Sequence, residues 1–160
     1  MLFSTRGRYG LKAMVDLALE YGQGPVSAAA LAQKQGVSTS YLEQMISSLK
    51  KAGLIVGARG AMGGYELSRA PEQIDVGSVL KALEGGTELV DCVGTENAAC
   101  ENACLCSARP LWIKLQSRIN DVLCSTTLKD MADDYRSQLS RQAEAIDMQN
   151  NNSNTQENLQ

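Results

Sequence analysis

The sequence predicts a mostly α-helical fold with one small β-hairpin, arranged as a winged helix-turn-helix. Two short helical segments joined by the turn Gly36-Val37, the second of them amphipathic, favour a helix-turn-helix over residues 27–52. Two short apolar strands then flank a glycine-rich tip at residues 57–64, the pattern of a β-hairpin. A helix-turn-helix followed by a hairpin is the winged-helix arrangement.

The first 52 residues contain three segments with the marks of helices. Apolar residues recur at helical spacing over 5–21, with Thr5 suited to the start of the helix and Gly22 to its end. Ser27 and Ser38 are good N-caps for the two helices that follow. The second of these has an apolar stripe that predicts one buried face, formed by Leu42, Met45, Ile46 and Leu49.

The elements after the helix-turn-helix follow from the same signals. Strands over 54–56 and 65–67 form the hairpin, and a helix over 76–84 comes next. Pro110 suits the first turn of a further helix. That helix has a stripe sustained over three turns: Leu111, Leu115, Ile119, Val122 and Leu123.

The C-terminal part of the sequence changes character. Thr127 is expected to cap a short last helix over 128–135. From about residue 141 the chain is polar and rich in Asn and Gln, which predicts a disordered tail over 141–160.

Charge divides the chain into two unlike halves. Residues 1–70 contain 8 Lys and Arg against 4 Asp and Glu, whereas residues 71–160 contain 7 against 14. A basic first half fits a DNA-facing region. No apolar run of about 18 residues predicts a membrane span, and the basic N-terminus lacks the apolar core of a signal peptide. We therefore expect a cytoplasmic protein.

Four of the five cysteines lie within fifteen residues, at Cys92, Cys100, Cys104 and Cys106. Crowded thiols form disulfides, bind a soft metal or sense oxidants. Disulfides are rare in the cytosol, and an odd number of cysteines argues against a complete disulfide framework. Both points favour a metal-binding or redox role for these cysteines.

The start of the helix over 38–52 is the expected DNA-reading element. In a helix-turn-helix the first residues of the second helix enter the major groove. Here these are Ser38, Thr39, Ser40, Tyr41, Glu43 and Gln44. Gln can pair with adenine and Glu with the cytosine amino group. The alternative is local: Ser40 and Glu43 have the spacing of a capping pair, and Tyr41 could pack on the first helix.

The hairpin tip contains a second candidate contact. Arg59 is flanked by glycines, and an arginine on a wing can reach into a narrow minor groove. Gly60 lets the backbone approach DNA closely. Further basic side chains suited to phosphate contacts are Arg6, Arg8, Lys50 and Lys51, although each could be an ordinary solvated charge.

The sequence resembles the IscR-like bacterial winged-helix regulators over about residues 1–135. The motifs are STRGRYGLKAM (4–14), STSYLEQ (38–44), RGAMGGY (59–65), IDVG (74–77), the cysteines before LW (111–112), and TL (127–128). Each motif alone is weak, whereas six in the right order are specific.

This resemblance implies a homodimeric transcription regulator, and not an enzyme, that senses an iron–sulfur cluster. Its regions would be a winged helix at 1–86, a cluster-binding loop at 87–109, and a dimerisation helix with a C-terminal helix at 110–140. The alternative for the stripe on the dimerisation helix is burial within one subunit. The family's base contacts fall on Ser40, Glu43, Gln44 and Arg59. Two such subunits would bind a pseudo-palindromic operator in double-stranded DNA, near genes of cluster assembly or iron homeostasis.

The family pattern of three cysteines, the last six residues before the tryptophan, falls on Cys92, Cys100 and Cys106. Some relatives add a histidine three residues after the third cysteine, where this chain has Arg109 and contains no histidine. Arginine offers no lone pair to a metal, so Cys104 is the candidate fourth ligand. Asp91, Glu96 and Glu101 are alternative oxygen donors, less suited to iron–sulfur clusters because they are hard ligands. The resemblance favours a 2Fe–2S over a 4Fe–4S cluster. Cys124 is expected to be a packed structural residue.

Two other functions remain open from the sequence. One keeps DNA binding but replaces the cluster with thiol or zinc sensing, or with control of cysteine metabolism. The other is a small redox protein, against which stand the missing Cys-x-x-Cys motif, histidine and nucleotide-binding glycine motif.

Overall fold

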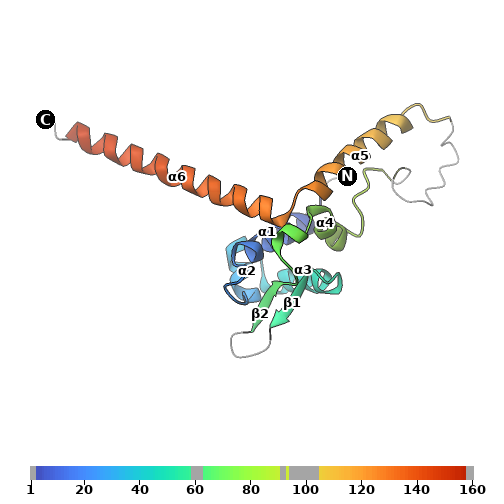
Figure 1. The fold of residues 1–160 in the computed structure, drawn as a ribbon, viewed down its shortest axis with the longest axis horizontal. Helices are drawn as coiled ribbons and strands as arrows, with labels where there is room; N and C mark the ends of the chain where they lie inside the picture. The colour runs from blue at the N-terminus through green and yellow to red at the C-terminus, as the bar shows by residue number, and fades with distance from the viewer. Residues whose placement is uncertain (1–2, 59–62, 91–92, 94–104, 158–160) are drawn as a thin grey trace.

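The computed structural model describes residues 3–58, 63–90, 93 and 105–157, with side chains through residue 146. The elements in order are α1 (Thr5–Leu19), α2 (Ala28–Gln35), α3 (Thr39–Lys51), β1 (Ile55–Ala58), β2 (Gly64–Leu67), the 3-10 helix η1 (Pro71–Gln73), α4 (Val76–Glu84), α5 (Arg109–Ser125) and α6 (Leu128–Glu157). Figure 1 shows α1–α4 and the hairpin as one body, from which α5 and α6 extend in different directions. The predicted fold class, mostly α with a small hairpin, is confirmed.

Side-chain caps set the starts of the helices. Ser27 and Ser38 accept the backbone N–H of the residue three positions on, as predicted. The cap of α1 is Ser4, one residue earlier than the predicted Thr5, and its hydroxyl oxygen accepts the Gly7 N–H. Thr127 accepts the Asp130 N–H at 3.1 Å, so its predicted capping role at α6 is also confirmed.

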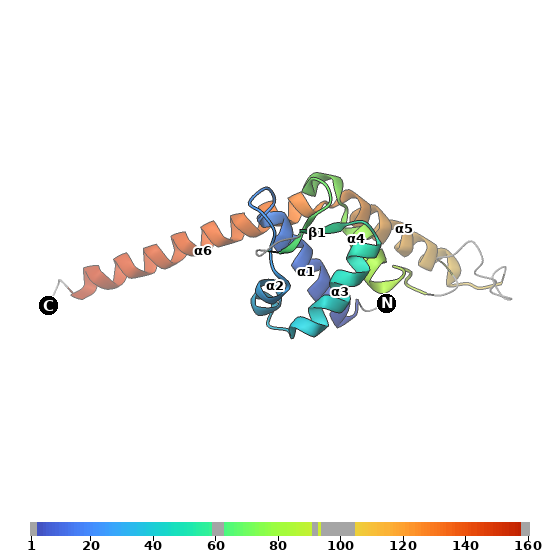
Figure 2. The same cartoon turned by 90° about the horizontal axis from the view of Figure 1, so that it is seen from below.

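One hydrophobic core joins α1, α2, α3, α4, the hairpin and the first turns of α6. The predicted stripe of α3 lies entirely within it, because Leu42, Met45, Ile46 and Leu49 are all buried. The largest fully buried side chains from the other elements are Met14, Leu31, Ile55, Ile74, Val79 and Leu128. In Figure 2, α3 lies alongside α1, which fixes its inner face.

The wing is a two-stranded antiparallel sheet with a third backbone contact. Ile55 pairs with Leu67 and Ala58 with Gly64, so the predicted strands are present with slightly shifted ends. Val26 adds a bridge to Tyr65 through N–H···O bonds of 3.0 and 2.9 Å. A Cβ at Gly64 would lie 2.6 Å from the Val26 carbonyl oxygen, so this approach requires glycine.

Close packing between α1 and α4 connects the helix-turn-helix to the C-terminal half. A Cβ at Gly10 would lie 2.5 Å from Leu83 Cδ1, so a larger residue at this position would force the Leu83 side chain to shift. At the start of α1, the Ser4 hydroxyl donates to Glu84 Oε1 at 2.6 Å. These contacts hold α4 against α1.

The prediction for the C-terminal region is wrong in one respect. We expected a short helix over 128–135 and a disordered tail from 141, but α6 continues to Glu157. The chain contains no Gly or Pro after Pro110, so nothing in the sequence forces the helix to stop. Asp133 also forms ion pairs with Lys129 and Arg136 along one face of the helix. The distance from Arg136 Nη1 to Asp133 Oδ1 is 3.0 Å.

Beyond its first turns, α6 leaves the body of the protein (Figure 1). Tyr135, Leu139 and Ile146 are exposed along it. Within the described part of the chain, no helix combines the length and apolar character of a membrane span.

Candidate nucleic-acid interface and cysteine segment

The first turns of α3 present a polar outer face. Thr39, Ser40, Glu43 and Gln44 are all exposed, while the apolar stripe of the same helix is buried. Residues three and four apart lie on one side of a helix, so these side chains share a surface. The structure thus brings together four of the six residues predicted to face the major groove.

The other two residues of this set serve the fold. The Ser38 hydroxyl oxygen accepts the Tyr41 N–H at 3.2 Å and caps α3. Tyr41 is half-buried and packs against the core. In the described residues, neither Ser40 nor Glu43 has a side-chain hydrogen bond, so their spacing does not produce a capping pair here.

A buried carboxylate holds α2 against α1. Asp16 is 6% exposed, and its Oδ1 lies 2.7 Å from Lys34 Nζ. Its second oxygen accepts a hydrogen bond from Gln35 Nε2. The hydrogen bond to Asp16 raises the pKa of Lys34 above its ordinary value. Two residues at the end of α2 are therefore fixed to α1, just before the turn into α3.

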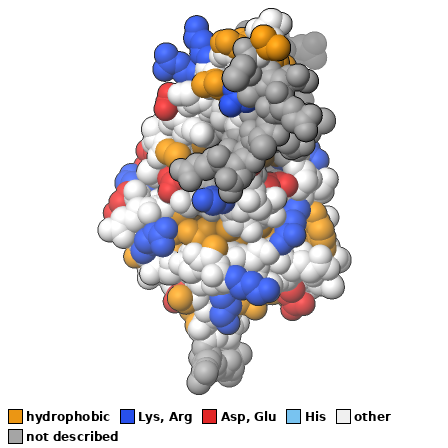
Figure 3. All heavy atoms as spheres, turned by 90° about the vertical axis from the view of Figure 1, so that its right-hand side faces the viewer, with side chains coloured by type: hydrophobic (Ala, Val, Ile, Leu, Met, Phe, Trp, Pro, Cys, Tyr) orange, Lys and Arg blue, Asp and Glu red, His pale blue; other side chains and the backbone are white. Residues whose placement is uncertain are grey.

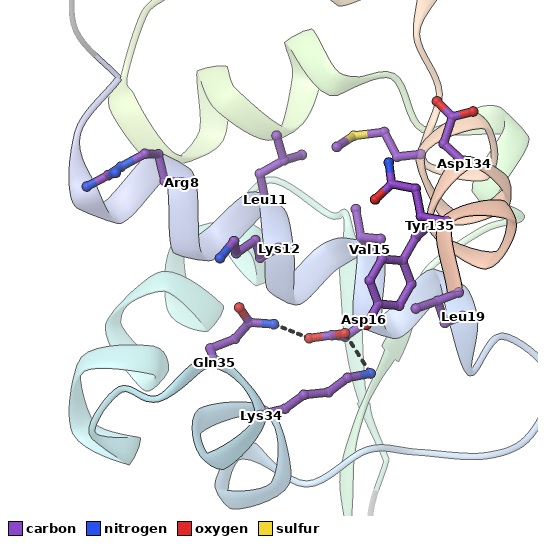
Figure 4. Close-up of a pocket in the computed structure, with 12 residues that line it drawn as sticks. Arg8, Leu11, Lys12, Val15, Asp16, Leu19, Lys34, Gln35, Asp134 and Tyr135 are labelled. Carbon is purple, nitrogen blue, oxygen red and sulfur yellow. Dashed lines mark hydrogen bonds and ion pairs between the residues drawn. The ribbon is translucent and has the colours of Figure 1, made fainter. Parts of the chain in front are cut away.

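Figure 4 shows that these three side chains meet below α1, in a groove between α1, α2 and α6. Its apolar lining comes from Leu11, Val15, Leu19, Met131 and Tyr135. At one end of the groove, Arg8 and Lys12 extend from α1. The groove marks where the first turns of α6 meet the DNA-binding region.

Basic side chains lie on α3 and on the neighbouring helix α1. Arg6 donates to the Ser48 hydroxyl, which ties α1 to α3, so this arginine has a structural contact beside its predicted phosphate role. Lys50 Nζ lies beside the wing, 3.6 Å from where a Cβ on Gly57 would stand. Arg8 and Lys51 are exposed. Figure 3 shows Lys and Arg side chains scattered over both the upper and the lower parts of one face of the molecule.

Several predicted site residues lie outside the described residues. These are Arg59 and Gly60 at the wing tip, and Cys92, Cys100 and Cys104 in the cysteine segment. Their roles stay predictions.

The two described cysteines differ from each other. Cys106 is half-buried and free, and its carbonyl oxygen accepts the Arg109 N–H at 3.2 Å where α5 begins. Cys124 is also free, but it is exposed near the end of α5. The prediction that Cys124 is packed is wrong for the single chain: the residue is exposed, although its Sγ would lie 3.5 Å from a Cβ on Gly77 of α4.

Sequence reasoning missed Gln116, although it is the one residue of α5 that is buried. Its Oε1 accepts the Leu89 N–H at 2.7 Å, and its Nε2 donates to the Thr87 carbonyl at 3.1 Å. A signal was present in the sequence. Gln116 is a polar residue on the side of the helix that also bears Trp112, Ile119 and Leu123, all half-buried.

The predicted stripe of α5 separates into two parts. Leu123 is half-buried and lies close to Gly77 of α4. Leu111, Leu115 and Val122 share a neighbouring face and are 55%, 39% and 62% exposed. Burial within one subunit, the alternative interpretation, therefore does not account for these three side chains.

Comparison with known proteins decides the family. The model of the Rrf2 family, described as an iron-dependent transcriptional regulator, matches residues 3–134. The chain belongs to the Rrf2 family. It is 42% identical to the HTH-type transcriptional regulator CymR of Bacillus subtilis (strain 168) over 132 residues, which is 82% of this chain and 90% of CymR. It is 38% identical to the regulator IscR of Aliivibrio salmonicida (strain LFI1238) over 152 residues, which is 95% of this chain and 89% of IscR.

Solved structures of Rrf2 proteins agree with this assignment. The structure of CymR, the global cysteine regulator of B. subtilis, matches with a TM-score of 0.70 at 41% identity, over 83% of this chain and 97% of that one. The structure of T. potens IscR matches with a TM-score of 0.69 at 41% identity, over 84% of this chain and 88% of that one. The predicted resemblance to IscR-like regulators is confirmed, and the chain is a winged-helix transcriptional regulator. Its relatives are transcriptional regulators, which agrees with the expected non-enzymatic role.

Proposed function

We propose that this chain is a homodimeric regulator whose affinity for a pseudo-palindromic operator depends on an iron–sulfur cluster bound by the cysteine segment. The proposal rests mainly on one observation: the four-cysteine segment leads directly into α5, a helix with an exposed apolar face. A ligand of that segment is thus connected by a few residues of chain to the surface suited to a second subunit.

The donor set fits a cluster. Thiolates are the usual ligands of iron–sulfur clusters, and Cys92, Cys100 and Cys106 would hold it, with Cys104 as the fourth ligand. Cys106 is free and only half-buried, so its sulfur is available. When bound, the cluster would supply a group whose presence follows iron supply and oxidative conditions. A 2Fe–2S cluster is favoured, and cluster-assembly or iron-homeostasis genes are the expected targets.

The winged helix supplies the DNA-binding step. The exposed side chains of Ser40, Glu43 and Gln44 would meet base edges in the major groove, and Arg59 would enter the minor groove. Lys50 and Lys51, in the last turn of α3, would meet phosphates. Pairing of α5 with α5 of the second subunit would set the distance between the two α3 helices. That distance would determine the spacing of the operator half-sites.

A second candidate is supported by the similarity to B. subtilis CymR, the global cysteine regulator. In that case the cysteines would respond to thiol chemistry or zinc without a cluster. Both candidates share the fold and the operator-binding surface, so DNA binding alone does not separate them.

Metal analysis after anaerobic purification separates the two candidates. We expect iron and acid-labile sulfide in stoichiometric amounts with the wild-type chain, and their loss in Cys106→Ala. Cys124→Ala is the matched control and should keep both. Protein that holds zinc, or takes up no iron and sulfide on reconstitution, would favour the cysteine-regulator candidate.

A further inference from the structure

One side chain fastens the start of the cysteine segment to α5. Gln116 accepts the Leu89 N–H at 2.7 Å and donates to the Thr87 carbonyl at 3.1 Å. It thus engages one N–H and one C=O of the same short segment, as a neighbouring β-strand would. A third bond, 2.9 Å to Asn120 Oδ1, orients the amide along the helix. All of these distances are those of well-formed hydrogen bonds.

These hydrogen bonds matter because Gln116 is buried. Gln116 is 7% exposed. A buried primary amide is tolerated because its donors and acceptor are used, and leaving them unpaired is costly. An apolar side chain of similar size would fill the same space without holding the 87–89 backbone. The amide therefore has a specific effect here, which is to fix that backbone to α5.

The other end of the cysteine segment is attached to the same helix. The Cys106 carbonyl accepts the Arg109 N–H at the first residue of α5. Gln116 lies seven residues further on, which is about 10 Å along a helix. Leu89 precedes Cys92 by three residues, and Cys106 precedes Arg109 by three. Both ends of the segment are thus anchored on the first half of α5.

We infer that Gln116 is the positioning residue through which a change in the cysteine segment reaches α5, and from there the operator-binding surface. This inference rests on the proposed function. A ligand shifts an equilibrium only if it favours one of two arrangements. Gln116 provides the contact that connects the arrangement of residues 87–89 to the helix with Leu111 and Leu115 on its outer face.

The test uses the full chain and three variants. Gln116→Leu keeps the volume but removes all three bonds. Gln116→Glu keeps an acceptor for the Leu89 N–H but no longer donates to Thr87. Asn120→Ala is the matched control, because it removes only the bond within α5. Two quantities are measured for each protein: the hydrogen-exchange rate of the Leu89 amide, and the ratio of operator dissociation constants between cluster-loaded and cluster-free protein.

In Gln116→Leu we expect the Leu89 amide to exchange at least about tenfold faster. The ratio of dissociation constants should move toward one by at least about fivefold, the lower end of typical coupling. Asn120→Ala should stay within about twofold of wild type in both. Unchanged exchange at Leu89 would overturn the anchor, and a wild-type ratio despite fast exchange would overturn the coupling.

Three further outcomes are also informative. If Gln116→Leu does not fold, Gln116→Glu decides: a reduced ratio supports the inference and a wild-type ratio contradicts it. Wild-type protein without iron and sulfide would contradict the proposed function, and with it this inference. A loaded wild type with normal coupling in both Gln116 variants would contradict this inference alone.

Discussion

Val122 is 62% exposed, more than the other large apolar residues of α5. Fully burying a valine is worth roughly 1.5–3 kcal/mol, so covering the remaining surface is worth roughly 1–2 kcal/mol. In a two-fold symmetric dimer the contact occurs twice, which gives roughly 2–4 kcal/mol per dimer. Val122→Asp should therefore weaken dimerisation by roughly 30- to 1,000-fold. Sedimentation equilibrium over a range of protein concentrations measures this directly.

Ser117→Asp is the control for this prediction. Ser117→Asp places the same charge on an exposed position of α5, on the opposite side of the helix. It should leave the dissociation constant within about threefold of wild type. If Val122→Asp also leaves it unchanged, the outer face of α5 is not the subunit interface, and the reasoning from exposed apolar surface is wrong.

Three further predictions concern DNA recognition and stability. Glu43→Ala should cost about 1–3 kcal/mol of operator affinity in a fluorescence anisotropy titration, with an unchanged melting temperature; equal affinity would remove Glu43 from the contacts. Asp16→Ala should lower the free energy of unfolding by about 1–3 kcal/mol in urea, because the Lys34 and Gln35 contacts are lost, whereas exposed Asp134→Ala should change it by less than about 0.5 kcal/mol. Partial burial raises the pKa of Asp75, but hydrogen bonds from the side chain and backbone of Ser78 outweigh this and leave that pKa below 3.8. Its stabilising effect is thus present above about pH 4 and disappears as the pH falls through the lowered pKa. The urea midpoint of Asp75→Asn should consequently fall less than that of wild type between pH 5 and pH 2.5; parallel losses would argue against this capping interaction.

The helix-turn-helix could be predicted closely because its signals are local. The period of Leu42, Met45, Ile46 and Leu49 fixes which face of α3 is buried, and Ser38 marks where the helix starts. The exposed face then follows, and with it the groove-facing residues Ser40, Glu43 and Gln44.

Features that depend on how α5 lies against the body could not be predicted in the same way. Its stripe indicated an apolar surface but not which residues meet α4 and which stay exposed. Cys124 was therefore placed in the packed part, although it is exposed. Gln116 was overlooked because its partners are backbone groups of residues 87 and 89, almost thirty positions away in the chain.

The end of α6 shows a different difficulty. The Asn- and Gln-rich composition after residue 141 is typical of disorder, yet the segment contains no helix-breaking Gly or Pro. Composition and local propensity therefore point in opposite directions, and in the structure the helix continues to Glu157.

The most direct test of the central claim is operator binding by one anaerobic preparation, measured before and after its cluster is removed with a chelator and an oxidant. We predict that the two dissociation constants differ by at least about fivefold, and that the difference vanishes in Cys106→Ala. Equal dissociation constants for loaded and cluster-free wild-type protein would contradict the proposal that the cysteine segment controls DNA binding through a cluster.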